Sequence, residues 1–283
     1  MSENEKKESS GEASSTVADK AADNTADKAD GKPAEEQSMS FMDHFKELRS
    51  RLIKIFLSML LGFIICWALR GYIIDFLCAP LLTALRDLGQ QEVIIATGVP
   101  ETFLTYMQIA FISGMFVSSP LIFYQVWAFI TPGLYEMEKV FIVPVALASA
   151  VFFILGGSFC YFIVFPNALP FLMGFGEEYI HNTPRMSEYY EFTLHLLLAF
   201  GLIFEMPLFA FFLARLGIIT ASTLRRFRRY FIVIAFVVAA IFTPPDVMSQ
   251  LCMALPMLIL YELSIIIAGV SGRKKKAKEV ESA

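Results

Sequence analysis

Residues 189–214 read YYEFTLHLLLAFGLIFEMPLFAFFLA. From Phe192 onward this run is apolar apart from Thr193, His195 and Glu205. An α-helix needs about 20 predominantly apolar residues to cross the roughly 30 Å hydrocarbon core of a bilayer. The run therefore predicts a membrane-spanning helix, and it raises the question of what a carboxylate does inside one.

The rest of the chain has the same apolar character. Of its 283 residues, 56% are hydrophobic, and the mean hydropathy of +0.59 is too high for an ordinary soluble domain. We expect an all-α polytopic membrane protein with six spans. The fifth is short, about 14 residues, and would need a locally thin bilayer. The expected spans are 52–69, 103–130, 141–165, 189–214, 230–243 and 247–269.

Both ends of the chain differ from this membrane region. Residues 1–40 hold five lysines and ten acidic side chains but no aromatic residue, so they cannot bury enough apolar surface to offset the entropy of ordering. We expect them to form a disordered polar tail, followed by a six-span domain at 41–270 and a basic tail at 271–283. Residues 41–283 then carry 18 basic and 17 acidic side chains (23 − 5 and 27 − 10), a balance that gives no reason to expect nucleic acid as a partner.

Lysine and arginine gather on one side of the expected spans. With the N-terminus in the cytoplasm, the cytoplasmic flanks hold fifteen of them and the outer loops hold three. Loops rich in Lys and Arg tend to stay on the cytoplasmic side, so we expect both termini there. The fifteen are Lys46, Arg49, Arg51, Lys54, Lys139, Arg215, Arg225, Arg226, Arg228, Arg229 and five more in 271–283, and the three are Arg70, Arg86 and Arg185.

Glu205 lies close to the midplane of its expected span. It precedes Arg215, which should mark the cytoplasmic end, by ten residues, or ~15 Å of helix. An acidic side chain at that depth costs about 2.5–3.5 kcal/mol on insertion scales, and such residues usually face protein or water and serve a function. Gly201 leaves room for close approach, and Pro207 favours a locally opened backbone. Three roles therefore remain open for Glu205. It can be a neutral side chain that bonds to a neighbouring helix, part of a docking site, or the proton-carrying group of a proton-coupled secondary transporter.

No set of residues predicts catalysis or a bound metal. The four cysteines lack C-x-x-C spacing, and the three histidines lack metal-ligand spacing. An intramembrane protease would need, for instance, G-x-S-x-G with a membrane histidine, or paired aspartates in separate spans. The sequence SSP at 118–120 lacks the glycines, and Asp246 has no partner aspartate within another span. We expect no enzyme activity, no cofactor and no metal.

Six motifs follow one another along the membrane region. They are HFKELRSRL (44–52), CAPL (78–81), SSPLIFYQVWAFITPGLYEMEK (118–139), YFIVFP (161–166), AFGLIFEMP (199–207) and FTPPDVMSQ (242–250). In this order and spacing they resemble the TatC family, the large polytopic subunit of the twin-arginine protein translocase. The resemblance covers about residues 41–270, and it implies a concave, cup-like bundle in a bacterial inner membrane.

The resemblance implies a receptor and not an enzyme. Family members bind signal peptides that bear two adjacent arginines. They then assemble smaller single-span partners, TatA and TatB, to pass folded proteins across the membrane with the proton gradient. By motif position, the peptide site falls on Glu47 and Glu138 with support from Arg49 and Phe129, and the intramembrane glutamate of the family falls on Glu205.

The last motif implies contacts with the partner helices. It places Thr243, Asp246 and Gln250 near the outer ends of the fifth and sixth spans, where family members contact those partners. A further position of that cluster is Ala240 here, where we would expect methionine, so the contact made at that point is not carried over. The resemblance also implies homo-oligomers with TatB, surrounded by membrane lipid.

The hydrogen-bonding geometry of arginine and carboxylate groups agrees with the implied peptide site. The planar guanidinium fork matches a carboxylate through two parallel hydrogen bonds, so two neighbouring arginines suit two separated carboxylates. Exposed ion pairs contribute only ~0–1 kcal/mol each, so a firm site should be partly shielded at the membrane edge. Two other interpretations remain open, since Glu47 can pair locally with Arg51 four residues on, and Glu138 can be a solvated loop charge.

Overall fold

The computed structural model describes residues 41–130, 142–174, 183–243 and 247–281. Residues 41–44 group with the N-terminal segment, and the description below concerns the unit from Phe45 onward. The predicted polar tail at 1–40 lies outside the described residues.

The described residues form nine α-helices and one short π-helical segment, with no strand among them. Five helical segments are long and apolar enough to cross a membrane: Phe45–Ala68, Glu101–Ile130, Ile142–Met173, Met186–Leu216 and Ser249–Val270. The elements are α1 (Phe41–Ala68), α2 (Arg70–Asp87), α3 (Glu101–Ile130), α4 (Ile142–Phe159), the π-helical segment Cys160–Val164, α5 (Phe165–Met173), α6 (Met186–Phe204), α7 (Met206–Leu216), α8 (Ala221–Phe242) and α9 (Val247–Glu281).

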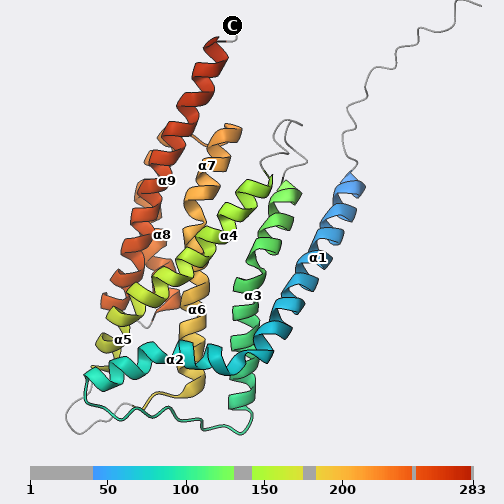
Figure 1. Ribbon diagram of the computed structural model, residues 1–283. Helices are drawn as coiled ribbons and strands as arrows, with labels where there is room; N and C mark the ends of the chain where they lie inside the picture. Colours follow the sequence, from blue (N-terminus) through green and yellow to red (C-terminus); the bar gives the residue numbers. More distant parts are fainter. Residues whose placement is uncertain (1–40, 131–141, 175–182, 244–246, 282–283) are drawn as a thin grey trace, which may run out of the picture. The chain divides into compact units, whose positions relative to one another are not determined.

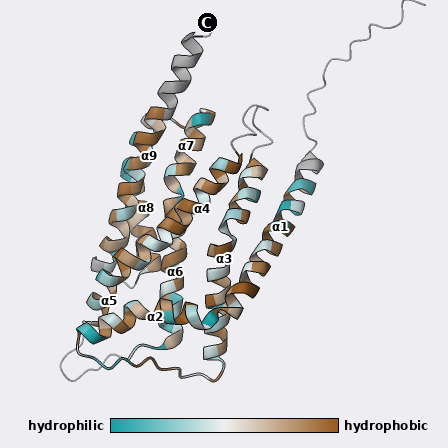
Figure 2. Ribbon diagram, in the orientation of Figure 1, coloured by the Kyte–Doolittle hydropathy of each residue, from teal (hydrophilic) through white to brown (hydrophobic). Residues whose placement is uncertain are grey.

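The helices pack both against their neighbours in the sequence and against helices further along the chain. The most extensive contacts join α7 to α9, α4 to α6, α8 to α9 and α3 to α4. Figure 1 shows α4 running at a slant to α3 and α6, with α2 lying across their lower ends. Most of the helical ribbon is white to brown in Figure 2, as expected for helices surrounded by lipid.

Charge distinguishes the two ends of this unit. We call the end where α1 begins and α3 and α7 finish the basic end, and the end that carries α2 the opposite end. Teal residues mark the start of α1 in Figure 2. The described basic end carries Lys46, Arg49, Arg51, Lys54, Arg215, Arg225, Arg226, Arg228 and Arg229.

Five of the six expected spans coincide with the qualifying segments, and the fifth expected span does not. All but the last residue of this expected span, 230–243, lie within α8, but arginines occupy the early turns of α8 and its apolar part, Tyr230–Phe242, is only ~20 Å long. That length falls short of the ~30 Å hydrocarbon core. The structure thus gives five qualifying spans where the sequence predicted six.

Helix α2 was not predicted, and it is bound to the bundle through its backbone carbonyls. Pro80 has no N–H to donate to the carbonyl of Phe76 one turn earlier. The Tyr161 hydroxyl donates to that carbonyl at 2.7 Å instead. Two hydroxyls from α6 also reach α2 carbonyls, Tyr189 to Leu77 at 2.6 Å and Tyr190 to Ile74 at 3.3 Å.

Glycines bring α1 and α3 into backbone contact. A Cβ placed on Gly114 would lie 2.7 Å from the backbone nitrogen of Phe63, and one on Gly62 would lie 2.5 Å from the carbonyl oxygen of Gly114. Alongside them, the Ser118 hydroxyl donates to the Ser58 carbonyl at 2.7 Å. Small residues at such a crossing are a common way to join membrane helices, which lack a hydrophobic drive to associate in lipid.

Candidate functional site

Glu47 lies half-buried on α1 at the basic end, one helical turn from Arg51. The Arg51 guanidinium donates to the Oε1 atom of Glu47 from Nη2 at 2.6 Å and from Nε at 2.9 Å. It also donates from Nη1 to the Oε1 atom of Gln125 on α3, at 3.4 Å. The local pairing that the sequence left open is therefore present. Because the Glu47 and Arg51 side chains keep 22% and 21% of their surface exposed, a ligand can still approach both.

Two other predicted peptide-site residues lie on the same two helices, α1 and α3. Arg49 is exposed on α1, and Phe129 is half-buried in the last turn of α3. Gln125 stands one turn before Phe129, so the Arg51 bridge joins Glu47 to the same end of α3. Glu138 lies outside the described residues.

Glu205 is enclosed where α6 ends and α7 begins. Only 2% of its surface is exposed, and neither carboxyl oxygen has a hydrogen-bond partner among the described residues. The side chain of Ser149 on α4 is a polar neighbour of this carboxyl group. The Ser149 hydroxyl in turn accepts a hydrogen bond from the indole nitrogen of Trp127 on α3, at 2.7 Å. Polar groups from three different spans thus meet inside an apolar bundle.

The sequence around Glu205 explains this position. Pro207 stands in the first turn of α7, where its missing N–H costs least, and the helical hydrogen bonding is interrupted at Glu205. Gly201 meets the Phe153 ring so closely that a Cβ would lie 2.6 Å from it. The predicted roles of Gly201 in close approach and of Pro207 in opening the backbone are both confirmed.

The predicted partner-contact residues gather where α8 meets α9. Thr243 caps the end of α8, is 7% exposed, and donates from Oγ1 to the carbonyl of Ala239 at 2.9 Å. Gln250 of α9 is half-buried and donates from Nε2 to the carbonyl of Phe236 at 2.9 Å. Ala240 is exposed on α8, and Asp246 lies outside the described residues.

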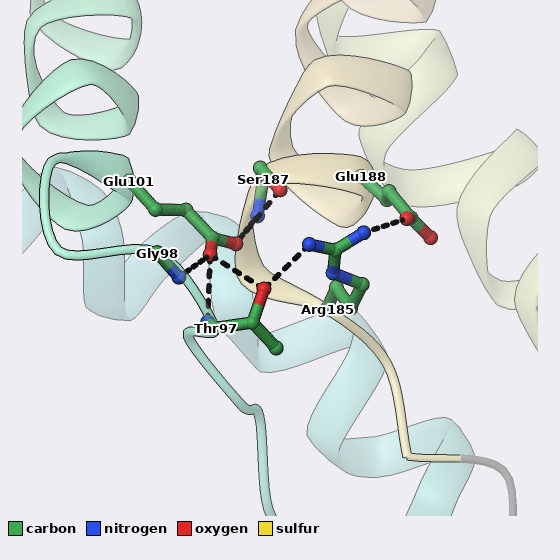
Figure 3. Close-up of polar contacts among 6 residues, drawn as sticks. All are labelled: Thr97, Gly98, Glu101, Arg185, Ser187 and Glu188. Carbon is green, nitrogen blue, oxygen red and sulfur yellow. Dashed lines mark hydrogen bonds and ion pairs between the residues drawn. The ribbon is translucent and has the colours of Figure 1, made fainter.

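A second polar cluster, at the opposite end, was missed by the sequence analysis. Figure 3 shows the carboxylate of Glu101, at the start of α3, facing groups from two separate loops. Its Oε2 atom accepts from the backbone of Thr97 at 2.7 Å and of Gly98 at 2.8 Å. Its Oε1 atom accepts from the Ser187 hydroxyl at 2.7 Å and the Ser187 backbone at 3.1 Å. One carboxylate therefore holds the turn that leads into α3 and caps the first turn of α6, where the helix dipole favours negative charge.

Further contacts join the same two loops. Arg185 donates to the Thr97 hydroxyl and forms an ion pair with Glu188 at 3.0 Å. Ile95 exchanges backbone hydrogen bonds with the other loop, accepting from Met186 at 2.9 Å. These contacts bind the residues before α3 to those before α6.

An exposed ion pair lies at the end of α2. Arg86 donates two hydrogen bonds of 2.9 Å to Glu92. This hydrogen bonding lowers the pKa of the Glu92 carboxyl below its ordinary value, so the pair is ionised at neutral pH. The Arg86–Glu92 pair serves as a reference for Glu101, which accepts hydrogen bonds from three residues.

One signal in the sequence could have indicated Glu101. Gly98 and Glu101 are three residues apart at a helix start, the spacing at which an acidic side chain reaches back to a free N–H group. The contacts with Ser187 carry no such local signal, because 86 positions separate the two residues.

These features define a class, a polytopic helical membrane protein with a buried polar group among its spans. The sequence profile described as Sec-independent protein translocase protein (TatC) matches residues 43–256. The Sec-independent protein translocase protein TatC of Desulforapulum autotrophicum is 44% identical over 88% of this chain and 91% of its own length. The corresponding protein of Aquifex aeolicus is 41% identical over 84% and 98%.

A solved structure agrees with these sequence matches. It is described as the crystal structure of the twin arginine translocase receptor TatC, and it is 40% identical, with a TM-score of 0.72 over 81% of this chain and 99% of that one. The chain belongs to the TatC family of Sec-independent protein translocase proteins. The resemblance drawn from the six motifs is confirmed.

Proposed function

We propose that this protein is the signal-peptide receptor of a twin-arginine translocase in a bacterial inner membrane, with both termini in the cytoplasm. It binds twin-arginine signal peptides at its basic end and organises TatA- and TatB-type subunits, which pass folded proteins outward with the proton motive force. The description of the related solved structure as a receptor supports this proposal.

The arrangement at Glu47 is the observation that carries the proposal. A basic peptide needs an acidic group on an otherwise basic surface, and Glu47 supplies one beside α3. Its present partner, Arg51, is a half-exposed guanidinium that such a peptide can replace with its own. Exposed ion pairs contribute only ~0–1 kcal/mol, so this exchange costs little. Glu138 would supply the second carboxylate, with Arg49 and Phe129 beside the bound peptide.

Glu205 suits a polar anchor for a helix that enters the bundle. Its carboxyl group lacks a hydrogen bond among the described residues, so a partner helix or an inserted signal peptide with one polar side chain can offer it one. Such a bond contributes about 0.6–2 kcal/mol in a membrane, weak enough for reversible assembly. Thr243, Asp246 and Gln250 would contact partner helices at the opposite end.

Photo-crosslinking of a twin-arginine signal peptide to the protein in native membranes tests the proposal. A peptide with two lysines in place of the arginines should crosslink much less, since lysine lacks the planar fork. Glu47→Gln and Glu138→Gln should each weaken binding about tenfold or more, as expected for a lost charge-assisted hydrogen bond of ~1.5–3 kcal/mol. The double variant should bind most weakly.

Glu92→Gln is the matched control, because it removes an ion-paired carboxylate at the opposite end. It should bind the peptide as the unchanged protein does. Unchanged affinity in both single variants at Glu47 and Glu138, with normal membrane insertion, would remove the site assignment.

A further inference from the structure

The early turns of α8 carry four arginines, and three of them form no ion pair with any residue that the structure describes. Arg228 is engaged by Glu262 of α9, through an Nε–Oε1 contact of 2.7 Å and an Nη2–Oε2 contact of 2.7 Å. Arg225, Arg226 and Arg229 are exposed. Arg225 and Arg229 are four residues apart, and like charges at this spacing on a helix repel each other. An anion from outside the described chain would relieve this arrangement.

The three arginines continue two exposed rows of α8 that are apolar further along. At four-residue spacing, Arg225 and Arg229 are followed by Val233, Val237 and Ile241, whose surfaces are 62%, 55% and 72% exposed. Residues four apart lie on the same face of an α-helix. The exposed surface of α8 is therefore cationic at the basic end and apolar toward the opposite end, as at a boundary between lipid headgroups and acyl chains.

The second row contains an aromatic residue, Tyr230, directly after Arg229 in the sequence. Arg226 is followed by Tyr230 and Ile234, both exposed. The guanidinium of Arg229 lies over the Tyr230 ring at 5.6 Å from its centre, and the Phe227 ring is 5.7 Å from Tyr230. Tyrosine is enriched at the headgroup level of membranes, because its ring is apolar and its hydroxyl is polar.

The position of these arginines on α8 brings them to the lipid phosphates. They directly precede the exposed apolar stretch Tyr230–Phe242, so their guanidinium groups lie where that stretch leaves the hydrocarbon core, at the headgroup level. Either the arginine side chains extend outward or the bilayer thins around them. Both arrangements place the guanidinium forks against phosphate oxygens.

We infer that Arg225, Arg226 and Arg229 form a binding site for the phosphodiester of an anionic phospholipid, with Tyr230 beside the bound headgroup. The planar fork of arginine binds two phosphate oxygens at once. Basic clusters beside a membrane helix attract anionic lipids by about 1 kcal/mol, or roughly fivefold, per residue. The inference requires that α8 lies in a membrane, and it does not depend on signal-peptide binding.

Lipid titration of the purified full-length protein in dodecylmaltoside tests the site. Thermal unfolding midpoints would be followed as dioleoylphosphatidylglycerol is added, and retained lipids would be counted by native mass spectrometry. The triple change Arg225→Gln, Arg226→Gln and Arg229→Gln should raise the half-saturating lipid concentration at least about tenfold. Arginine-to-lysine changes at the three positions should give an intermediate effect. The single change R226Q should give a smaller shift in the same direction, and it serves if the triple variant is unstable.

Three controls separate lipid binding at these arginines from a general effect of charge or of phosphate. Lys274→Gln, Lys275→Gln and Lys276→Gln together remove the same charge elsewhere and should reduce lipid affinity by much less, because lysine lacks the planar fork that binds two phosphate oxygens. Dioleoylphosphatidylcholine, and inorganic phosphate at equal concentration, should not shift the midpoint. An unchanged response in the arginine variants, an equal loss in the lysine control, or an equal shift with free phosphate would each overturn the assignment.

Discussion

The carboxyl group of Glu205 occupies an apolar interior without a hydrogen bond from any described residue. Leaving a buried polar group unsatisfied costs ~1–3 kcal/mol, so a leucine of similar volume would make a more stable bundle. A side chain that lowers stability and is shaped by a helix interruption suits an interaction made only when a partner is present. Residues at functional sites often reduce stability in this way.

For Glu205→Leu we therefore expect a thermal unfolding midpoint equal to or above that of the unchanged protein. We also expect this variant to lose crosslinks between the midplane of α6 and partner helices. Glu205→Gln should keep much of the transport activity, because the amide retains hydrogen bonding without charge. Transport assays, crosslinking and thermal unfolding in detergent would measure these three outcomes.

The same variants distinguish anchoring from proton transfer. A glutamine variant as inactive as the leucine variant, with partner crosslinks intact in both, would exclude anchoring and indicate a titrating group instead.

Glu101 joins the turn before α3 to the start of α6, so we expect it to act on stability. For Glu101→Ala we expect the thermal unfolding midpoint to fall by roughly 2–4 °C, as for the loss of a helix cap in a domain of this size, because this carboxylate caps α6 and holds the turn before α3. Glu92→Ala should lower the midpoint by less, since its ion pair is exposed and joins only one partner. Thermal unfolding of both variants under the same conditions makes the comparison. Equal losses at the two positions would contradict the capping role.

For single residues, the sequence predicts a role where the residue type differs from its neighbours along the chain. Glu205 is recognisable as a carboxylate within an apolar run, and Gly201 and Pro207 support it from within the same turn or two. The partner of Glu101, in contrast, is brought to it by folding alone. The pairing of Glu47 with Arg51 was foreseen as an alternative because four-residue spacing is a local property.

The helices that the sequence predicts are likewise those with a clear local hydropathy signal. Long apolar runs predict five spans well, because crossing lipid requires about 20 predominantly apolar residues in succession. Two helices are less visible in the sequence. Helix α2 contains Arg70, Asp75, Asp87 and a proline, so hydropathy does not reveal it, and α8 mixes arginines with a short apolar part. The interruption between α6 and α7 was foreseen only as an opened backbone at Pro207.

Helix crossings provide a prediction of their own. Gly114→Val should destabilise the protein by ~1–3 kcal/mol, because the new side chain would push into the backbone of α1 at Phe63. Gly71→Ala is the matched control, since a Cβ there meets nothing within 4 Å. Thermal unfolding in detergent should separate the two variants clearly. A tolerated valine at Gly114 would mean that α1 and α3 are not in backbone contact.

At the scale of the whole molecule, the charges predict an orientation in the membrane. Fifteen lysines and arginines were assigned to the cytoplasmic side and three to the outer side, and the described ones lie at the two corresponding ends of the unit. Sequence alone predicts this division because insertion responds to flanking charge and not to the final packing. The expected cup-like shape and the number of copies would depend on packing between helices and chains, which no local pattern specifies.

Cysteine labelling from either side of the membrane tests the orientation. Cys66, Cys78, Cys160 and Cys252 would first be replaced. A cysteine substituted for the fully exposed Val99 should react with an impermeant thiol reagent in spheroplasts. One substituted for the exposed Ser222 should react only after lysis. Val99 serves better than Ser187, whose hydroxyl and backbone are bound to Glu101. Labelling of Ser222→Cys in intact spheroplasts would show that the topology is the reverse of the proposed one.

The hydrogen bond between the Tyr161 hydroxyl and the Phe76 carbonyl also bears on how this protein can evolve. That carbonyl needs an outside donor only because Pro80 cannot supply one. A tyrosine-to-phenylalanine change at 161 is therefore harmful while proline is present, and it becomes nearly neutral once position 80 carries a residue with an N–H group. The two positions lie far apart in the sequence but are epistatic, and the order in which they change determines whether a lineage passes through an unstable ancestor.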